Sequence, residues 1–262
     1  LGDEDEEIRE ASAMTLGACL RRAHEPEDCS IIIAPLVAAM NDRHAAPAAR
    51  GALLAIGVDV VVRELEKLVA GDGPRYSLLH PDSSTAERLL HLVAEREEIG
   101  GYAVFALGKL GPRALDPALE GLRSEDLAVR RTSAEAMQLI LPKFRTDRNR
   151  MKAFEPLFAA LSDPDRKVRG GARYAVWKLG EPALKPLITK LETGEPRSRE
   201  EAAIAMQNIL PKTRDRKLLA AAEEALIRAL DHEQLRPYAA EALKRIDSEG
   251  AKKALREAGI MP

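Results

Sequence analysis

The stretch "SDPDRKVRGGARYAVWKLGEPALKPLITKL", residues Ser162 to Leu191, decides how the chain folds. Small and apolar residues fall at offsets 0, 4, 7, 8 and 11 from Val168, which is one face of a helix with 3.6 residues per turn. Ser162 or Asp163 is suited to cap this helix, and a second apolar stripe begins after Pro182. The stretch therefore predicts a helical hairpin.

The pattern of the first helix recurs along the chain, which makes the hairpin a repeat unit. Offsets 4 and 7 are small and offsets 8 and 11 are apolar in every copy, so neighbouring helices can approach closely and interdigitate. "KLG" at Lys109 returns at Lys178, and "ILP" at Ile140 returns at Ile209, both after 69 residues. This spacing indicates duplication of a pair of hairpins. The seven copies begin at Ile8, Ala45, Ile99, Val129, Val168, Ser198 and Leu235.

One interval between copies is longer than the others and contains an irregular region, residues 69–96. It has a segment with Gly and Pro, followed by one helix expected near Thr85 to Arg96. We interpret the region as an insertion or a degenerate unit that has lost most of its first helix, within a single domain of residues 1–262. Leu1 stands seven residues before Ile8, as a leucine stands before other copies, so we expect the chain to be a fragment of a longer array.

The composition favours helices and sets limits on partners. Hydrophobic residues make up 45% of the chain but aromatic residues only 3%, which suits close-packed helices better than sheets. With 40 Lys and Arg against 42 Asp and Glu, the net charge of −2 gives no overall attraction to nucleic acid or to an anionic membrane. No apolar run is long enough to span a membrane, and no signal peptide opens the chain. We expect a cytoplasmic protein without membrane association.

An acidic residue four positions before an arginine opens several of the first helices, and "LG" followed by a Pro-started second helix closes them. In these features the chain resembles the HEAT repeats, especially the short bacterial form first noted in phycocyanobilin lyase subunits. The resemblance covers nearly the whole chain. It implies an all-α fold, a right-handed α-solenoid of about seven hairpins, and a non-enzymatic scaffold for binding another protein.

The resemblance further implies that the acid and arginine pairs form a polar ladder between successive repeats. Independently, an acid four residues before an arginine is a favourable helical pair, of about 0.2 to 0.5 kcal/mol. The copies at Ala45 and Ile99 lack the arginine, so we expect the ladder to be interrupted there. Its residues are Asp5, Arg9, Asp126, Arg130, Asp165, Arg169, Glu195 and Arg199.

No catalytic residue, metal site or cofactor is predicted. The pairs at His24 and His232, each followed by Glu, are similar to the iron-binding pairs of HEAT-repeat deoxyhypusine hydroxylases, but they stand at other positions of the repeat. Cys19, His24 and Cys29 are too few for a structural zinc site, which needs four ligands. Cys19 is expected to be a small buried residue, and a disulfide to Cys29 stays an open alternative. No Gly-rich phosphate loop or nucleophile with a supporting base is present.

Two places are candidates for binding a protein partner. Trp177 lies about 160° from the apolar stripe of its helix, with Tyr174 one turn earlier, and such a pair is enriched at binding hot spots. The alternative is that Trp177 packs beneath an adjoining repeat or covers a gap left by Gly170 and Gly171. The second candidate is the irregular loop with Tyr76 and His80, whose alternative is a plain surface loop.

A nucleic-acid partner is the alternative function. Two loops 69 residues apart are basic and are expected at the same edge of the solenoid, which is similar to the HEAT-like alkylpurine DNA glycosylases. The balanced net charge and the scarcity of aromatic residues argue against that function, and solvated charged loops are the simpler interpretation. The basic residues are Lys143, Arg145, Arg148 and Arg150 in one loop, and Lys212, Arg214 and Arg216 in the other.

Overall fold

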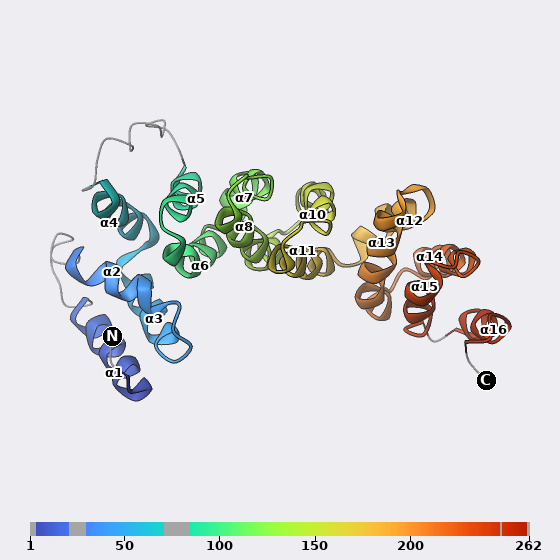
Figure 1. Ribbon diagram of the computed structural model, residues 1–262, viewed down its shortest axis with the longest axis horizontal. Coiled ribbons are helices and arrows are strands. Elements are labelled where there is room, and N and C mark those ends of the chain that lie inside the picture. Colours follow the sequence, from blue (N-terminus) through green and yellow to red (C-terminus); the bar gives the residue numbers. More distant parts are fainter. Residues whose placement is uncertain (1–3, 21–29, 71–83, 247, 261–262) are drawn as a thin grey trace. The chain divides into compact units, whose positions relative to one another are not determined.

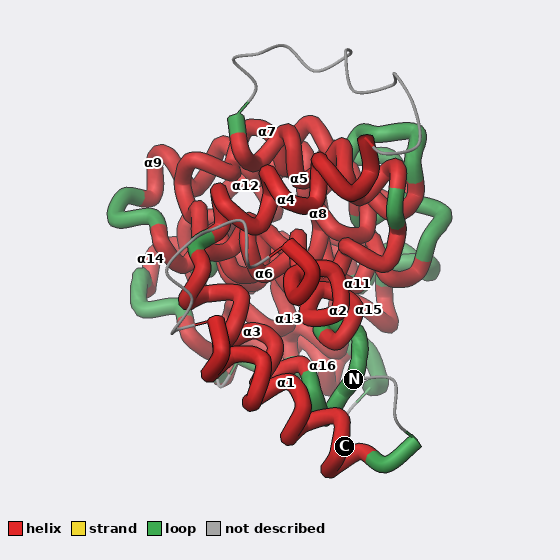
Figure 2. Tube along the Cα trace, turned by 90° about the vertical axis from the view of Figure 1, so that its left-hand side faces the viewer, coloured by secondary structure: helices red, strands yellow, loops and turns green. Residues whose placement is uncertain are grey.

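A computed structural model describes residues 4–20, 30–70, 84–246 and 248–260. Helices are the only regular elements in these ranges, and no strand occurs in them (Figures 1 and 2). The chain divides into two compact units, Leu1–Ile140 and Leu141–Pro262, which are described separately as unit 1 and unit 2.

Unit 1 has two layers of helices. The first helices of the repeats pack on one another, α1 on α3 and α6 on α8, while α2, α4, α5 and α7 follow one another in the second layer. Figure 1 shows α5 and α7 above α6 and α8. The elements are α1 (Glu6–Leu20), α2 (Ser30–Ala39), α3 (Ala46–Ile56), α4 (Val58–Ala70), α5 (Thr85–Glu95), η3 (Glu97–Ile99), α6 (Gly100–Leu110), η4 (Gly111–Ala114), α7 (Leu115–Gly121) and α8 (Leu127–Ile140).

Unit 2 has the same two layers. First helices α11, α13 and α15 pack in sequence, and second helices α12, α14 and α16 cover them. Figure 1 shows α10 and α12 above α11 and α13. The elements are η5 (Leu141–Lys143), α9 (Asp147–Arg150), η6 (Met151–Ala153), α10 (Phe154–Ala160), α11 (Arg166–Leu179), η7 (Glu181–Ala183), α12 (Leu184–Thr193), α13 (Pro196–Ile209), η8 (Leu210–Lys212), α14 (Arg216–Ala229), α15 (Arg236–Leu243) and α16 (Glu249–Glu257).

The predicted α-solenoid architecture is confirmed within each unit. All seven expected first helices are helices, namely α1, α3, α6, α8, α11, α13 and α15. The helix expected near Thr85 is α5, which begins with a capping box: the side chains of Ser84 and Glu87 each accept a hydrogen bond from the backbone N–H of the other. It lies in the second layer, in contact with α4 and α7. Residues 71–83 of the irregular region lie outside the described ranges.

The two sequence endings of the first helices produce two different turns. At "LG", Gly111 and Gly180 adopt φ values of 61° and 69°, a left-handed conformation that glycine reaches without a steric penalty. At "ILP", α8 and α13 continue directly into the short 3-10 turns η5 and η8 without a residue of positive φ, whereas η4 begins at Gly111 and η7 follows Gly180. Because the endings alternate along the chain, the loops that follow them differ in length, as the 69-residue spacing indicates.

The start of α11 corrects one detail of the expected hairpin. The N-cap is Asp165, whose carboxylate accepts hydrogen bonds from the backbone N–H groups of Lys167 and Val168. Asp163 lies before the helix and accepts from the backbone N–H of Asp165 at 2.7 Å. Both aspartates could cap a helix at this place, and Asp165, the one nearer the apolar stripe, is the N-cap.

Gly170 is not the site of a close helix contact. It is exposed, and a Cβ added there would meet no atom within 4 Å. Its neighbour Gly171 is buried. An exposed glycine inside a helix costs stability because its backbone loses more freedom on folding than that of alanine.

Gly170→Ala is therefore expected to raise the free energy of unfolding by about 0.5 to 1 kcal/mol, measured by denaturant unfolding. Gly108→Ala in α6 is the matched control, since its added Cβ would lie 2.7 Å from the Cβ of Leu139. That variant is expected to be destabilised. A loss of stability in Gly170→Ala would contradict the open space around this residue.

Candidate partner-binding surface

The outer side of the first helices carries exposed apolar residues at matching positions. Offsets 6, 9 and 10 of the repeat pattern point away from the buried stripe. Six large hydrophobic residues are exposed in the described ranges, and four of them stand at these offsets. The four are Met14 in α1, Leu54 in α3, Leu139 in α8 and Tyr174 in α11. The other two, Ile8 and Leu127, lie near helix starts.

In unit 2 this side holds a group that we call the Trp177 cluster, made of Tyr174, Trp177, Lys178 and Lys212. The rings of Tyr174 and Trp177 meet edge to face, with centroids 4.8 Å apart. The Nζ of Lys178 lies 4.7 Å from the Trp177 centroid and 5.0 Å from that of Tyr174. The Nζ of Lys212 lies 4.4 Å from the Trp177 centroid. The indole, half-buried, is thus flanked by two ammonium groups and one phenol ring.

The backbone around Lys212 is fixed by contacts to the end of α11. The carboxylate of Glu181 in η7 accepts hydrogen bonds from the backbone N–H of Arg214 at 2.6 Å and of Asp215 at 3.4 Å. Asp215 in turn caps α14 through the N–H groups of Lys217 and Leu218. The segment that follows Lys212 is therefore held by Glu181 and by the cap of α14, and Lys212 itself is the last residue of η8.

Neither lysine of the Trp177 cluster has a carboxylate within 4 Å among the described residues. The equivalent side of α15 is different, because Lys244 and Arg245 lie 3.7 and 3.8 Å from the carboxylate of Glu241. Glu241 occupies offset 6, the position of Tyr174 in α11. On α11 an aromatic ring thus occupies the position where α15 has the acid that pairs with both basic groups.

A related group occurs in unit 1, 69 residues earlier. Phe105 occupies the position of Tyr174 and Lys109 that of Lys178, with Lys109 Nζ 5.5 Å from the phenyl centroid. The guanidinium of Arg50 from α3 lies 5.1 Å from the same ring. The aromatic and lysine pair is therefore a feature of the duplicated hairpins. Sequence reasoning missed it, although the same shift that aligns the two "KLG" motifs also aligns Phe105 with Tyr174.

The two units carry opposite net charges, which the overall value of −2 conceals. Residues 1–140 contain 15 Lys and Arg against 24 Asp and Glu, a balance of −9. Residues 141–262 contain 25 Lys and Arg against 18 Asp and Glu, a balance of +7. The Trp177 cluster belongs to the positive unit, so its local charge agrees with its wider surroundings.

The predicted basic loops both belong to unit 2. Arg148 and Arg150 lie in α9 and Arg216 begins α14, and Figure 2 shows these two helices on the same side. Arg145, Arg148, Arg214 and Arg216 are exposed, with no ion pair to another described residue. Arg150 forms an ion pair with Asp147. The structure thus joins one predicted basic residue, Lys212, directly to the predicted aromatic pair. Lys143 lies in η5, a turn that packs against α11.

The acid and arginine motif takes a different form from the expected ladder. In α11 the acid, Asp165, caps the helix, while Arg169 Nη1 donates to the backbone carbonyls of Asp163 and Pro164, both at 2.7 Å. Asp126 accepts from the N–H of Val129, and Arg130 donates to the carbonyls of Ser124 and Glu125. Arg199 Nε donates to the carbonyl of Leu191, and the Glu195 side chain makes no cap. The arginines therefore fasten the loop before each helix, which corrects the expected pairing within these three motifs.

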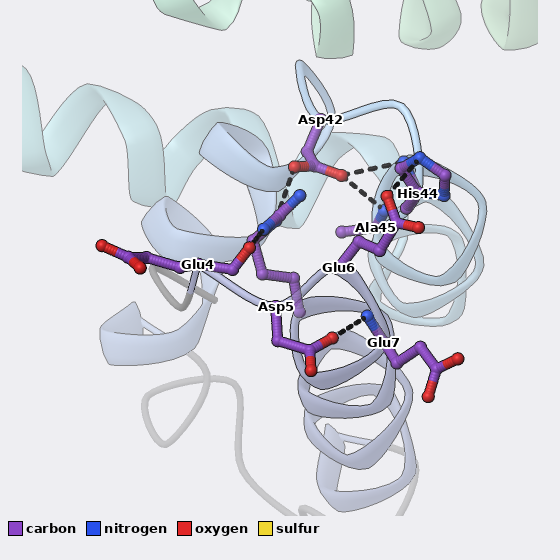
Figure 3. Close-up of polar contacts among 8 residues, drawn as sticks. Glu4, Asp5, Glu6, Glu7, Asp42, His44 and Ala45 are labelled. Atoms are coloured by element: carbon purple, nitrogen blue, oxygen red, sulfur yellow. Dashed lines mark hydrogen bonds and ion pairs between the residues drawn. The ribbon is translucent and has the colours of Figure 1, made fainter.

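In the first repeat the arginine does connect two repeats. Arg9 Nε donates to Asp42 Oδ2 at 2.7 Å, from α1 to the turn before α3, while Asp5 accepts from the N–H of Glu7. The other carboxylate oxygen of Asp42 accepts from the N–H groups of His44 and Ala45 (Figure 3). These backbone hydrogen bonds, that of Ala45 first, together with Arg9 hold the pKa of Asp42 below its ordinary value of 3.8.

Because the pKa of Asp42 is lower in the folded state, its contribution to stability is present above pH 3.8 and is lost as the pH falls through the folded value. Asp42→Asn is expected to lower the melting temperature at neutral pH, and the difference from wild type is expected to shrink below pH 3.8. Thermal unfolding followed by circular dichroism across this range checks it. A difference that stays constant with pH would contradict the role of the charge.

The remaining candidate residues of the sequence analysis lie outside the part of the chain that the structure describes. Tyr76 and His80 fall in residues 71–83, and Cys29 and the side chain of Cys19 are likewise not described. Among the described residues, no group of three or more His, Cys, Asp or Glu could hold a metal ion. No helix in those ranges is long and apolar enough to cross a membrane.

Comparison with known proteins gives likenesses to solved structures of engineered and designed proteins. No protein-family model matches the chain, and no curated protein matches it. An engineered structural-genomics target is 24% identical, over 68% of this chain and 86% of its own, with a TM-score of 0.39. A second engineered target is 21% identical, over 99% and 70%, with a TM-score of 0.42. A designed armadillo repeat protein in complex with the peptide (KR)4 is 20% identical, over 91% and 89%, with a TM-score of 0.33.

Proposed function

We propose that the protein is a non-enzymatic scaffold, built of HEAT-like repeats, that binds another protein through the outer side of its first helices. The observation that carries this proposal is the recurrence of exposed apolar side chains at the same three offsets of α1, α3, α8 and α11. The buried stripe occupies other offsets, and each of these four side chains is at least 40% exposed. Apolar groups repeated along one side of a solenoid are typical of a surface that a partner covers.

The test is quantitative affinity capture from an extract of the source cell. The double variant Leu54→Glu and Leu139→Glu places charges at two positions of the proposed surface of unit 1 that are 40% and 44% exposed, and its melting temperature is compared with that of wild type. Bound proteins are expected to fall at least about tenfold, because each carboxylate would have to be desolvated in the interface. Ala220→Glu, at an exposed position of α14 in the second layer, is the control and is expected to leave capture unchanged. An unchanged set of bound proteins in the double variant would defeat the proposal.

Nucleic-acid binding is the second candidate, favoured by the +7 balance of residues 141–262 and by the exposed arginines of the two basic loops. Binding through phosphates should weaken steeply with salt, because each neutralised phosphate releases counterions. Titration of labelled DNA and RNA oligonucleotides at increasing salt decides the matter. Absence of affinity at low salt removes this candidate.

A further inference from the structure

We propose that the Trp177 cluster binds an acidic peptide segment of the partner, with carboxylates that reach Lys178 and Lys212 beside the indole ring. The proposal rests on the protein-binding function above and specifies the chemistry of what is bound. Its basis is that two ammonium groups are held against one ring while no described carboxylate neutralises either of them.

The aromatic rings explain why the two charges can stand close together without an acid. Each ammonium interacts favourably with the negative face of the indole, which offsets part of their mutual repulsion. A lysine in this position still presents N–H donors to solvent, since the ring engages only one side of the group. An arriving carboxylate therefore gains a charge-assisted hydrogen bond and does not have to displace an existing ion pair.

The spacing of the two lysines indicates how many acids the segment needs. Their Nζ atoms lie 4.7 and 4.4 Å from the same centroid, so they are at most about 9 Å apart. In an extended peptide, side chains two positions apart lie on the same side, about 6.5 to 7 Å from each other. Two acidic residues separated by one residue therefore fit the pair. An apolar side chain next to them would meet the exposed ring of Tyr174.

A single strand of nucleic acid fits this cluster less well. Non-specific strand binding uses aromatic faces on which bases stack. The Trp177 ring is already approached by Lys178, Lys212 and the edge of Tyr174, all within 5 Å of its centroid, so a base would have to displace one of them. A carboxylate approaches the ammonium groups from solvent and leaves the ring contacts intact. The geometry thus favours an acidic peptide.

The experiment uses the full chain and a fluorescein-labelled octapeptide of alternating Glu and Asp, followed by fluorescence anisotropy at low salt. Wild type is expected to bind it, and Lys178→Gln with Lys212→Gln is expected to weaken binding at least about tenfold. Lys178→Arg with Lys212→Arg keeps both charges and is expected to retain binding. Lys244→Gln with Arg245→Gln removes the same charge just after α15 of the same unit, where both groups already pair with Glu241, and is expected to bind like wild type.

Each other outcome overturns the proposal in a defined way. Equal losses in the two Gln double variants would mean that affinity follows the net charge of unit 2 and that no site exists at Trp177. No binding of the acidic octapeptide, with binding of oligo-dT that depends on Lys178 and Lys212, would assign the cluster to nucleic acid. Self-association of wild type that the Lys178 and Lys212 variant abolishes, without peptide binding, would assign it to the acidic unit of a second copy.

The failure of this inference is distinguishable from failure of the proposed function. If Leu54→Glu with Leu139→Glu abolishes capture of partners while the lysine variants bind them normally, the scaffold function stands and the acidic segment is wrong. The octapeptide could instead bind at Lys178 and Lys212 while neither the Leu54 and Leu139 variant nor the Lys178 and Lys212 variant changes the capture of partners. The cluster would then be a peptide site, but the wider surface would not be an interface.

Discussion

Leu53→Ala is expected to lower the free energy of unfolding by about 2 to 5 kcal/mol, whereas the same change at Leu54 is expected to cost about 1 kcal/mol or less. The two leucines are neighbours on α3, so helix propensity and length are matched. Leu53 stands at offset 8 of the repeat pattern and is 1% exposed, while Leu54 at offset 9 is 40% exposed. Truncating the first leaves a cavity between packed helices, and truncating the second mainly removes contact with solvent.

Chemical denaturation of the two variants measures this difference, with the slope of the transition compared as well as its midpoint. Leu53 shares offset 8 with residues that are all buried in five other first helices, so the result bears on more than one helix. These residues are Leu107, Met137, Val176, Met206 and Leu243. Equal costs at Leu53 and Leu54 would show that offset 9 belongs to the core. The proposed binding surface, which contains that offset, would then be wrong.

The sequence was sufficient for the helices because every copy of the repeat meets the same local requirements. The small residues at offsets 4 and 7 and the apolar residues at offsets 8 and 11 are buried in α11, where Ala172, Ala175, Val176 and Leu179 are all 0% exposed. The glycine of "LG" adopts a positive φ at both Gly111 and Gly180. Burial along a helix and the turn at its end depend on residues that are near in sequence, so the spacing of residue types is enough to predict them.

The roles of charged side chains were harder to predict. Spacing showed that Arg169 is four residues after Asp165, which suits an ion pair, yet the guanidinium bonds to two loop carbonyls. Those acceptors come within reach only once the loop before α11 has turned. The carboxylate of Asp165 likewise accepts hydrogen bonds from the backbone N–H groups at the start of α11. A rule based on helical spacing describes neither these N–H groups nor the loop carbonyls.

The candidate site was predicted in part for the same reason. Trp177 and Tyr174 could be placed together because they share one helix face, and their rings do meet. Lys212 was predicted only as a member of a basic loop, since its approach to Trp177 depends on the packing of α13 against α11 and on the anchoring of the loop by Glu181. The opposite charges of the two units depend on their boundary, which appears only in the fold.

Trp177→Ala is expected to weaken partner binding at least about tenfold while changing the melting temperature little. The indole is half-buried, and its ring contacts are the phenol of Tyr174 and two lysines near the surface. Removing it would free Lys178 and Lys212 to extend into solvent and would separate the two charges. The partner would then lose both the apolar contact and the fixed pair of donors, so the loss should exceed that of either contact alone.

Val176→Ala is the matched control for this prediction, because Val176 precedes Trp177 on α11 and is 0% exposed. It is expected to do the reverse, lowering the melting temperature while leaving the binding constant of the folded protein unchanged. Trp177→Phe keeps an aromatic face for the lysines and should bind between wild type and Trp177→Ala. Since Trp177 is the chain's single tryptophan, its fluorescence also reports on the site directly. A large drop in melting temperature for Trp177→Ala, comparable with that of Val176→Ala, would place the indole in the core and reduce the Trp177 cluster to packing between repeats.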